Sequence, residues 1–192
     1  MARDVTEQGL SRDELIALRN KRTGVTVFQI SWILVFVCLI VVNLQIRANF
    51  ASWPPPGVAT LSPVLPTAAT IGLILSGLLA RRGLIAVRTA HLPSYFRYWL
   101  AAMILGAAFL LVMAYEFLAV PISGQYSSVF RVMTAFHATH ALVIGVIMRN
   151  VYQNARAGAY DATRHWGIEV AAKMWYFVVV AWIMFYTVLY LI

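Results

Sequence analysis

The sequence predicts an all-α membrane protein with five transmembrane helices. Hydrophobic residues make up 61% of its 192 positions and charged residues only 11%, whereas a soluble domain is about half apolar and about a quarter charged. So few charges cannot cover a surface exposed to water, and we therefore expect the surrounding solvent to be lipid. Five apolar stretches approach or exceed the length of about 20 residues that a spanning helix needs. Lipid offers the backbone no hydrogen-bond partners, so each stretch must be helical.

Prolines, glycines and a pair of arginines mark the ends of the first three spans. Trp53-Pro54-Pro55-Pro56-Gly57 follows the first span and forbids further helix. Arg81-Arg82-Gly83 follows the second, although residues 84–87 could extend that helix, and Pro121 ends the third. The five spans are expected at residues 26–46, 65–80, 98–120, 129–152 and 168–191.

The first 22 residues are expected to form a cytoplasmic tail ahead of a five-helix domain over residues 23–192. The tail is charged and mixed, and it has neither the apolar stretch nor the small-residue cleavage site of a signal peptide. Ser11 and Glu14 form the pattern of a capping box for a short surface helix. One face of that helix would carry Leu10, Leu15, Ile16 and Leu18. We favour a solvated tail that partly folds against a partner.

The positions of the basic residues predict the orientation of the chain in the membrane. Two of the segments between spans, residues 48–63 and 121–126, contain no Lys or Arg. The other segments outside the spans are basic: they contain Arg3, Arg12, Arg19, Lys21 and Arg22 in the tail, Arg81, Arg82, Arg88 and Arg97 between the second and third spans, and Arg149, Arg156 and Arg164 around the connection of the fourth and fifth. Basic segments remain in the cytoplasm, so the N-terminus is expected inside and the C-terminus outside.

The net charge of +8 does not indicate a nucleic-acid partner. The basic residues lie in short segments between apolar spans, whereas a nucleic-acid-binding domain gathers them on one folded face. The single Cys38 lies within an apolar stretch, so this chain alone can form neither a disulfide framework nor a cysteine metal site. We expect an integral, multi-pass membrane protein.

A series of short motifs runs in order along the five spans. In the first three spans and the first loop they are Ser31, Arg47, Trp53-Pro54-Pro55, Gly57, Leu65-Pro66, Ser76-Gly77, Leu105-Gly106, Phe109-Leu110 and Glu116-Phe117. In the last two they are Tyr126-Ser127-Ser128, Phe130, Thr134, Phe136-His137, His140, Gly145, Gly167, Glu169, Trp175, Phe177-Val178 and Trp182. Because these motifs occur in this order, the chain resembles subunit III of the haem-copper cytochrome c oxidases, in its short five-helix form.

The resemblance implies a splayed two-plus-three helix bundle with a V-shaped cleft that holds phospholipid. It also implies a non-catalytic subunit of a terminal respiratory complex that reduces O2 to water while moving protons. The chain would pack on subunit I beside subunit II, with cytochrome c as electron donor and with haem and copper in the partner subunits. It would support proton uptake and turnover stability, in a bacterial-type plasma membrane.

Other functions stay open at this point. The short form is similar to relatives in quinol oxidases and nitric oxide reductases, so the electron donor is not decided. A stand-alone transporter would be expected to have inverted repeats and broken helices, and the sequence has no convincing internal repeat. A di-haem cytochrome would need more histidines within the spans. We expect the isolated chain to carry no haem or copper and to have no catalytic residue.

Several positions depart from the pattern of the family. Trp32 stands where the family has a glutamate linked to proton uptake, and Met113 replaces a usual glutamine. Tyr176 and Val179 stand where the family has His and Asp, and Lys173 replaces an aromatic residue. Functions of those family positions are therefore not carried over to this chain.

Two histidines and one glutamate are candidate polar contacts within the bilayer. His137 and His140 are three residues apart and share a helix face. A haem or metal site would need further imidazoles, and the other histidines, His91 and His165, lie in loops. We therefore expect hydrogen bonds between helices, with Glu116 of the third span as a candidate partner of the histidine pair.

The remaining candidates are an ion pair and four arginines. Glu169 and Lys173 are four residues apart at the start of the fifth span, an order that suits both an ion pair and the helix dipole. We expect a structural clamp here, and a proton relay is the alternative. Four arginines near span ends are candidate ligands for lipid head groups or ordinary interfacial anchors: Arg47 and Arg131 outside, Arg149 and Arg156 inside.

Reporter fusions test the orientation. A topology reporter attached after Ile192 should read as external, and one inserted near Ala157 should read as cytoplasmic, because basic segments are retained inside. Both reporters on the same side of the membrane would rule out five spans.

Overall fold

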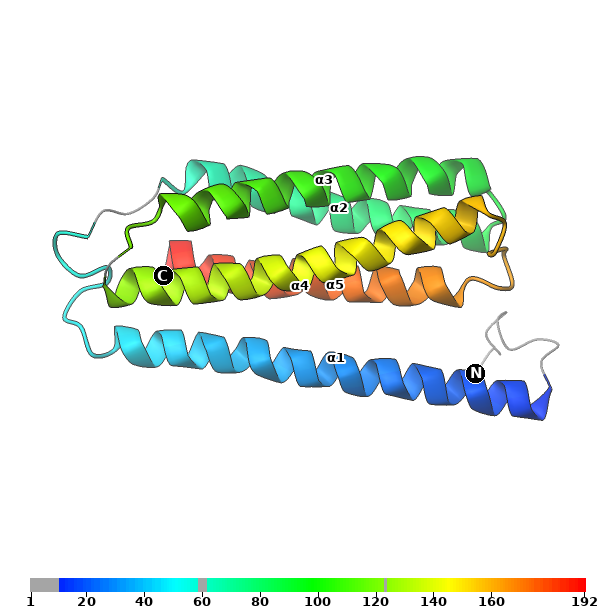
Figure 1. Cartoon of the computed structure of the whole chain (residues 1–192), viewed down its shortest axis with the longest axis horizontal. Coiled ribbons are helices and arrows are strands. Elements are labelled where there is room, and N and C mark those ends of the chain that lie inside the picture. The colour runs from blue at the N-terminus through cyan, green and yellow to red at the C-terminus, as the bar shows by residue number, and fades with distance from the viewer. Residues whose placement is uncertain (1–10, 59–61, 123) are drawn as a thin grey trace.

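The computed structural model describes residues 11–58, 62–122 and 124–192, and in this part of the chain every regular element is a helix. Five of these helices are long and apolar enough to cross a membrane, which confirms the predicted all-α fold. The elements are α1 (Arg12–Arg47), α2 (Val64–Arg88), α3 (Leu92–Ala119), α4 (Gln125–Arg156), α5 (Trp166–Tyr186) and the π-helix η2 (Thr187–Leu191) (Figure 1).

α1 and α2 are longer than the sequence pattern predicts. The expected capping box is present, since Ser11 Oγ accepts from the Glu14 amide at 3.3 Å and Glu14 Oε2 accepts from the Ser11 amide at 2.8 Å. From there α1 continues without a break for 36 residues, so the expected surface helix forms the first turns of α1 and is no separate element. α2 likewise runs through Gly83, because no proline interrupts it before Arg88.

Helices α2 to α5 form a four-helix bundle, and α1 lies against its α4 and α5 side (Figure 1). Within α1 only Phe36 and Asn43 are buried. The two-plus-three division expected from the resemblance is therefore not the division that this chain has. Cross-helix contacts of small and aromatic residues hold α2 with α3 and α5, whereas α1 presents mostly large aliphatic side chains to the outside.

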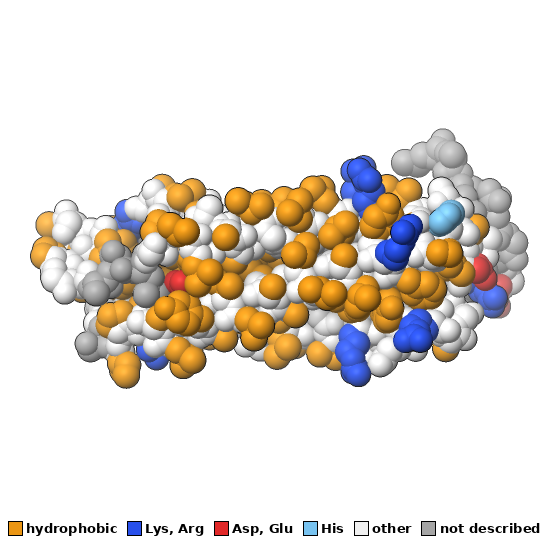
Figure 2. Space-filling model, turned by 90° about the horizontal axis from the view of Figure 1, so that it is seen from above, with side chains coloured by type: hydrophobic (Ala, Val, Ile, Leu, Met, Phe, Trp, Pro, Cys, Tyr) orange, Lys and Arg blue, Asp and Glu red, His pale blue; other side chains and the backbone are white. Residues whose placement is uncertain are grey.

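The three basic segments lie at one end of the bundle. The N-terminal part of α1, the α2–α3 connection and the α4–α5 connection are together at that end, which we call the basic end, while the C-terminus lies at the opposite end (Figure 1). On the face shown in Figure 2, most Lys and Arg side chains gather toward the basic end and hydrophobic side chains cover the middle. This arrangement is the one that an odd number of antiparallel spans requires.

Three buried tryptophans tie the helices of the bundle together. The indole N–H of Trp175 donates to Ser76 Oγ at 2.8 Å, and the indole N–H of Trp182 donates to Thr70 Oγ1 at 2.8 Å, so both join α5 to α2. Trp99 of α3 donates to the carbonyl oxygen of Met148 in α4 at 3.1 Å. Because a buried indole N–H needs a partner, each ring is held in one position.

The packing of Trp175 against α3 depends on Gly106. A Cβ atom at this position would lie 2.5 Å from Cζ2 of Trp175, a distance at which one of the two groups must move. Gly145 of α4 is different, since a Cβ atom there would have no neighbour within 4 Å. The tryptophan ring thus packs directly onto the backbone of α3.

Replacement of Gly106 tests this packing. Gly106→Ala should lower stability by about 1–3 kcal/mol through overpacking, measured as a lower thermal unfolding midpoint in detergent. Gly145→Ala is the matched control and should be neutral or slightly stabilising, because Ala favours helix over Gly by up to about 1 kcal/mol. Equal midpoints for the two variants would contradict the close contact.

Candidate functional site

Buried polar groups lie at three levels along the bundle. Glu169 and its ion-pair partners lie near the basic end, His137 and His140 lie midway, and Glu116 lies toward the opposite end. Ionisable groups at such depth are costly, so they mark functional or assembly sites. At each level, the residues that contact these groups come from more than one helix.

Among the described residues, Glu169 near the basic end has two cations beside its carboxylate. Lys173 Nζ lies 2.7 Å from Glu169 Oε1, one helical turn along α5, so the expected pair is present. Arg88 Nη2 of α2 lies 3.3 Å from Glu169 Oε2. The carboxylate side chain is 6% exposed, while those of Arg88 and Lys173 are 46% and 49% exposed. The buried anion is thus held between two half-exposed cations from two helices, which we call the basic-end cluster.

The same cluster reaches α1. The side-chain amide of Gln29 donates to the carbonyl oxygen of Lys173 at 3.2 Å. The guanidinium of Arg22 lies 5.5 Å from the ring centroid of Trp166, and Lys173 Nζ lies 5.9 Å from it. One aromatic ring therefore contacts cations from α1 and α5, and the cluster links the peripheral helix to the bundle.

Arg88 is a member of this site that sequence reasoning misses. From the sequence it counts only among the basic residues between the second and third spans, because the second span is expected to end before Arg81. The sequence does contain a usable signal, since an extension of that helix over residues 84–87 places Arg88 in its last turn. A basic residue there lies at the same membrane level as the start of α5.

Asp161 orders the loop that leads into α5. Its carboxylate accepts hydrogen bonds from the Thr163 hydroxyl at 2.6 Å and from the amides of Arg164 and Thr163 at 2.7 and 2.8 Å. These bonds, of which the one from the Thr163 hydroxyl has the largest effect, hold the pKa of Asp161 well below its usual range. This carboxylate is therefore ionised throughout the physiological pH range and is a structural acceptor.

His137 is enclosed by aromatic rings midway along the bundle. It is fully buried, and its ring stacks on Trp182 with centroids 5.1 Å apart and an interplanar angle of 30°. Phe109 and Phe36 lie edge-on at 5.6 and 5.9 Å. Neither ring nitrogen has a hydrogen-bond partner within the described residues. The imidazole therefore fills the core as an aromatic group.

His140 lies on the α1 side of the same level. Its ring centroid is 4.6 Å from that of Trp32 and 5.4 Å from those of Phe36 and Phe177. The side chain is nine-tenths buried, and its Nε2 has no partner in the described part of the protein. Trp32 thus covers a histidine with an indole ring.

The expected contact between Glu116 and the histidines is wrong. Phe109 of α3 faces His137, and Glu116 is seven residues further along, which is about 10 Å at 1.5 Å per residue. Glu116 Oε2 instead accepts a hydrogen bond from the Tyr190 hydroxyl at 3.2 Å. Tyr190 lies in the π-helix that continues α5. Both residues lie near the same end of their helices, a match in depth that could have indicated the pair.

No cluster that could hold a metal ion is found in the described part of the chain. Within those residues no three His, Cys, Asp or Glu side chains come together as ligands require. The two histidines of the middle level are packed against rings of Trp182 and Trp32. Their surroundings fit neither a haem nor a metal ion.

The four candidate head-group arginines differ in how freely they can bind a ligand. Arg131 is partly engaged, since its Nη2 donates to the carbonyl oxygen of Val120 at 2.9 Å and its guanidinium lies 5.0 Å from the Phe117 ring. Arg47, at the same end, is half-buried. Arg149 and Arg156 are exposed on α4.

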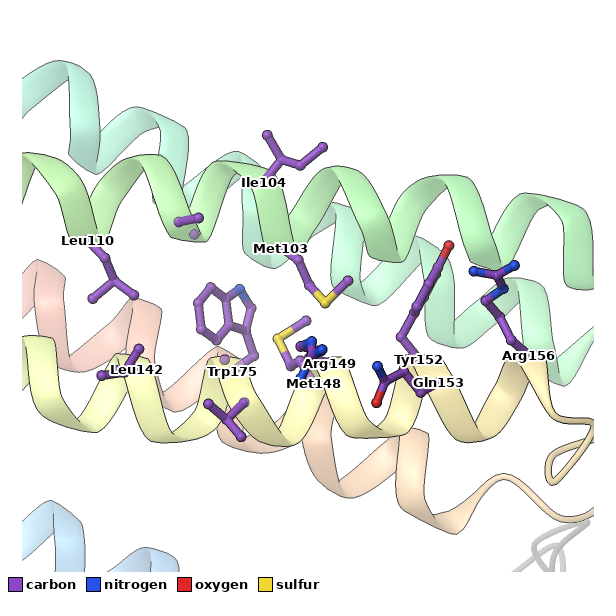
Figure 3. A pocket seen from close by; sticks show the side chains of 14 residues that line it. Met103, Ile104, Leu110, Leu142, Met148, Arg149, Tyr152, Gln153, Arg156 and Trp175 are labelled. Carbon is purple, nitrogen blue, oxygen red and sulfur yellow. The ribbon is translucent and has the colours of Figure 1, made fainter.

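Arg149 and Arg156 line a pocket between α3 and α4 (Figure 3). The pocket has a volume of about 500 Å³, and Figure 3 shows Trp175 of α5 behind it, between the two helices. In Figure 3, Leu110 and Leu142 lie toward one end, Arg156 lies toward the other, and Arg149 lies between them beside Met148. The pocket thus combines an apolar trough with two cations along the part nearer the basic end, and we call it the α3/α4 pocket.

Comparisons of this chain with a family model and with individual proteins point to the same family. The family described as "Cytochrome c oxidase subunit III" matches residues 1–192. The chain is 33% identical over 174 residues to cytochrome c oxidase subunit 3 of Thermostichus vulcanus, covering 88% of this chain and 86% of that protein. It is 28% identical over 173 residues to the Synechocystis protein of the same name, covering 88% and 74%. For the Lumbricus terrestris protein the identity is 30% over 143 residues, covering 72% and 55%.

Substitutions in the basic-end cluster test its role as a clamp. Arg88→Gln or Lys173→Gln alone should cost less than about 1 kcal/mol, because Glu169 keeps one half-exposed partner. Both substitutions together should cost about 3 kcal/mol, because they remove both of the cations that the described residues place beside this buried carboxylate. Adding Glu169→Gln to that double variant should recover most of the loss.

The measurement is the unfolding midpoint of the purified protein together with its amount in membranes. Arg81→Gln with Arg82→Gln is the matched control, since it removes two exposed charges at the same end. If Glu169→Gln made the double variant less stable still, the clamp would be excluded and independent roles would be indicated.

Proposed function

This chain belongs to the cytochrome c oxidase subunit III family, and from that premise we propose that it is the non-catalytic third subunit of a terminal respiratory haem-copper oxidase. The complex would reduce O2 to water and translocate protons, with cytochrome c as electron donor. The family match over residues 1–192 carries this proposal. The haems and copper would belong to partner subunits, of which subunit I would be the main contact and subunit II a further one.

We propose the orientation given by the basic segments. Their position at one end of the bundle supports a single cytoplasmic face, with the N-terminus inside and the C-terminus outside. Residues 1–22 would then form a cytoplasmic tail. The membrane would be a bacterial-type plasma membrane. In this orientation the basic-end cluster and the α4 arginines face the compartment from which protons are taken up.

A phospholipid is the ligand that the α3/α4 pocket fits best. Its apolar walls match an acyl chain, and Arg149 and Arg156 are placed where a head-group phosphate would lie. The volume of about 500 Å³ accommodates a large part of one chain. Bound lipid would act as a structural component of this subunit and of its contact with the rest of the complex.

The proposed contribution to turnover is supportive. Trp32 occupies the position of the family's carboxylate and packs on His140, so this chain offers no carboxylate there for proton transfer. Support for proton uptake would instead come from the charged surface near Arg88, Glu169 and Lys173 and from retained lipid. Loss of the subunit should therefore shorten the time over which the complex stays active more than it lowers the initial rate of O2 reduction.

Removal of the subunit from the purified complex tests the proposal. The haem-copper spectrum should stay intact and initial O2 reduction should remain substantial, while activity should decay faster during sustained turnover. An oxygen-electrode time course on matched complexes with and without this chain measures both. Immediate and complete loss of activity with the metal centres still in place would show that this chain takes part in the chemistry.

Two paired variants separate the lipid role from a general loss of charge. The double variant Arg149→Gln with Arg156→Gln should contain less co-purified phospholipid, and its activity should decay faster during turnover, because both arginines line the α3/α4 pocket. Arg81→Gln with Arg82→Gln removes the same charge from the same end outside the pocket and should change neither. Equal lipid content in both double variants would contradict lipid binding by this pocket.

A further inference from the structure

The cations near the basic end differ in whether an acid balances their charge. Arg88 and Lys173 lie beside Glu169. Neither Arg149 nor Arg156 has an acidic partner in the described part of the chain, and no Asp or Glu is among the described residues that line the α3/α4 pocket. Both arginines are exposed, so a ligand from the surroundings can reach them. The pocket therefore presents two accessible positive charges without compensation.

A tyrosine adds a hydrogen-bonding group to this part of the pocket. Figure 3 shows the side chains of Tyr152 and Arg156 directed from α4 toward α3. The Tyr152 ring packs edge-on against Phe96 of α3, with centroids 5.6 Å apart and an interplanar angle of 88°. A guanidinium forms charge-assisted hydrogen bonds with a phosphate, and a phenol hydroxyl can donate a further one. These groups suit a head group that carries a phosphate.

Gly145 leaves the apolar part of the pocket open. It lines the pocket on α4, and a Cβ atom there would have no neighbour within 4 Å. Contact between helices therefore does not require this glycine, although a glycine within a helix costs up to about 1 kcal/mol relative to alanine. Glycine is favoured where a ligand approaches the backbone closely. A ligand chain that lies against α4 at this point would explain the residue.

The pocket continues along the same two helices as a second hollow of about 310 Å³. Leu110 lines both spaces, so they meet at this side chain. On α4 the lining extends from Arg149 to Ala138 of the second hollow, a distance of about 16 Å at 1.5 Å per residue. One leaflet of the hydrocarbon core is about 15 Å deep. The two spaces together thus have the length of one acyl chain whose head group lies at Arg149.

We propose that the α3/α4 pocket selects an anionic phospholipid, from the leaflet at the basic end, over a zwitterionic one. The proposal rests on the phospholipid binding proposed above and adds the class of lipid that is bound. The phosphate lies at Arg149 and Arg156, and one acyl chain runs over Gly145 toward Leu110. The choline group of phosphatidylcholine brings a positive charge that both arginines repel, whereas phosphatidylglycerol carries the phosphate charge alone. Two basic residues give a preference of about thirtyfold, which corresponds to about 2 kcal/mol.

Two photoactivatable lipids that differ only in their head groups test the selection. Phosphatidylglycerol and phosphatidylcholine with the same diazirine-bearing acyl chain are each added in trace amounts to phosphatidylcholine nanodiscs that hold the purified complex. Mass spectrometry should locate adducts at Met103, Leu142 and Val146, which line the pocket. Per mole of probe, phosphatidylglycerol should give about thirtyfold more of these adducts.

The outcomes separate this proposal from the phospholipid binding on which it rests. Equal labelling of these residues by the two probes would overturn the selection by charge and leave phospholipid binding in place. Absence of adducts from both probes would overturn phospholipid binding by this pocket and the selection with it.

Paired arginine variants identify the groups that select. In Arg149→Gln with Arg156→Gln, labelling by the phosphatidylglycerol probe should fall to the level of the phosphatidylcholine probe. Arg81→Gln with Arg82→Gln is the matched control, since it removes two exposed charges near the same end outside the pocket, and the preference should persist. A preference that survives in the first double variant would show that its two arginines do not select the lipid.

A pair of alanine variants tests the position of the acyl chain without a change of charge. Ala107 and Ala108 are both exposed on α3, and Ala107 lines the pocket whereas Ala108 is not among its lining residues. Ala107→Phe should reduce labelling by both probes severalfold, because the ring occupies the space of the chain. Ala108→Phe should leave labelling unchanged. Equal labelling in the two variants would place the chain outside the pocket and overturn the proposal.

Discussion

The structure depends on the requirement that polar groups inside a bilayer find their partners within the protein. For the backbone this requirement produces the helices. For side chains it produces cross-helix hydrogen bonds, of which those of Trp175 and Trp182 to Ser76 and Thr70 are the clearest. The hydroxyl of Ser76 then donates to the carbonyl oxygen of Ala102, so that one chain of hydrogen bonds joins α5, α2 and α3. These bonds set the positions of the bulky rings between which the remaining core packs.

The same requirement explains the different treatment of the two buried carboxylates. Glu169 lies near the basic end, where half-exposed cations can reach it from α2 and from α5. Glu116 lies near the opposite end and accepts a hydrogen bond from a tyrosine hydroxyl. The two cations beside Glu169 offset the charge of a carboxylate, whereas the phenol beside Glu116 offers no opposite charge. The basic end is therefore where a clamp between helices can be built from charges.

The two grooves of α4 differ in chemistry because α4 faces different neighbours on its two sides. Toward α3 the lining of the pocket includes the cations Arg149 and Arg156. Toward α1 lies a second groove, between α1 and α4, and its described lining carries no charge and is mostly apolar. α1 is held mainly by aromatic contacts of Phe36 and by its links to the basic-end cluster. Few of its side chains are buried, so α1 packs less tightly than the four helices of the bundle.

The sequence by itself determined the number and type of the spans, the antiparallel arrangement that gathers the basic segments, and the pair Glu169–Lys173. These follow from hydropathy, from proline positions and from spacing along one helix, all of which are local properties. The family also followed from the sequence, through motifs whose order is local information. Such features need no knowledge of which helices are neighbours.

Only the tertiary structure decided which residues meet across helices. Arg88 reaches Glu169 because α2 continues past Gly83, and Glu116 meets Tyr190 rather than the histidines because the register of α3 against α4 places Phe109 opposite His137. The packing of α1 beside a four-helix bundle, with Trp32 against His140, could likewise not be predicted from the sequence. Helix register and neighbour choice arise from many small packing contacts summed over the whole bundle, and no single stretch of sequence contains that sum.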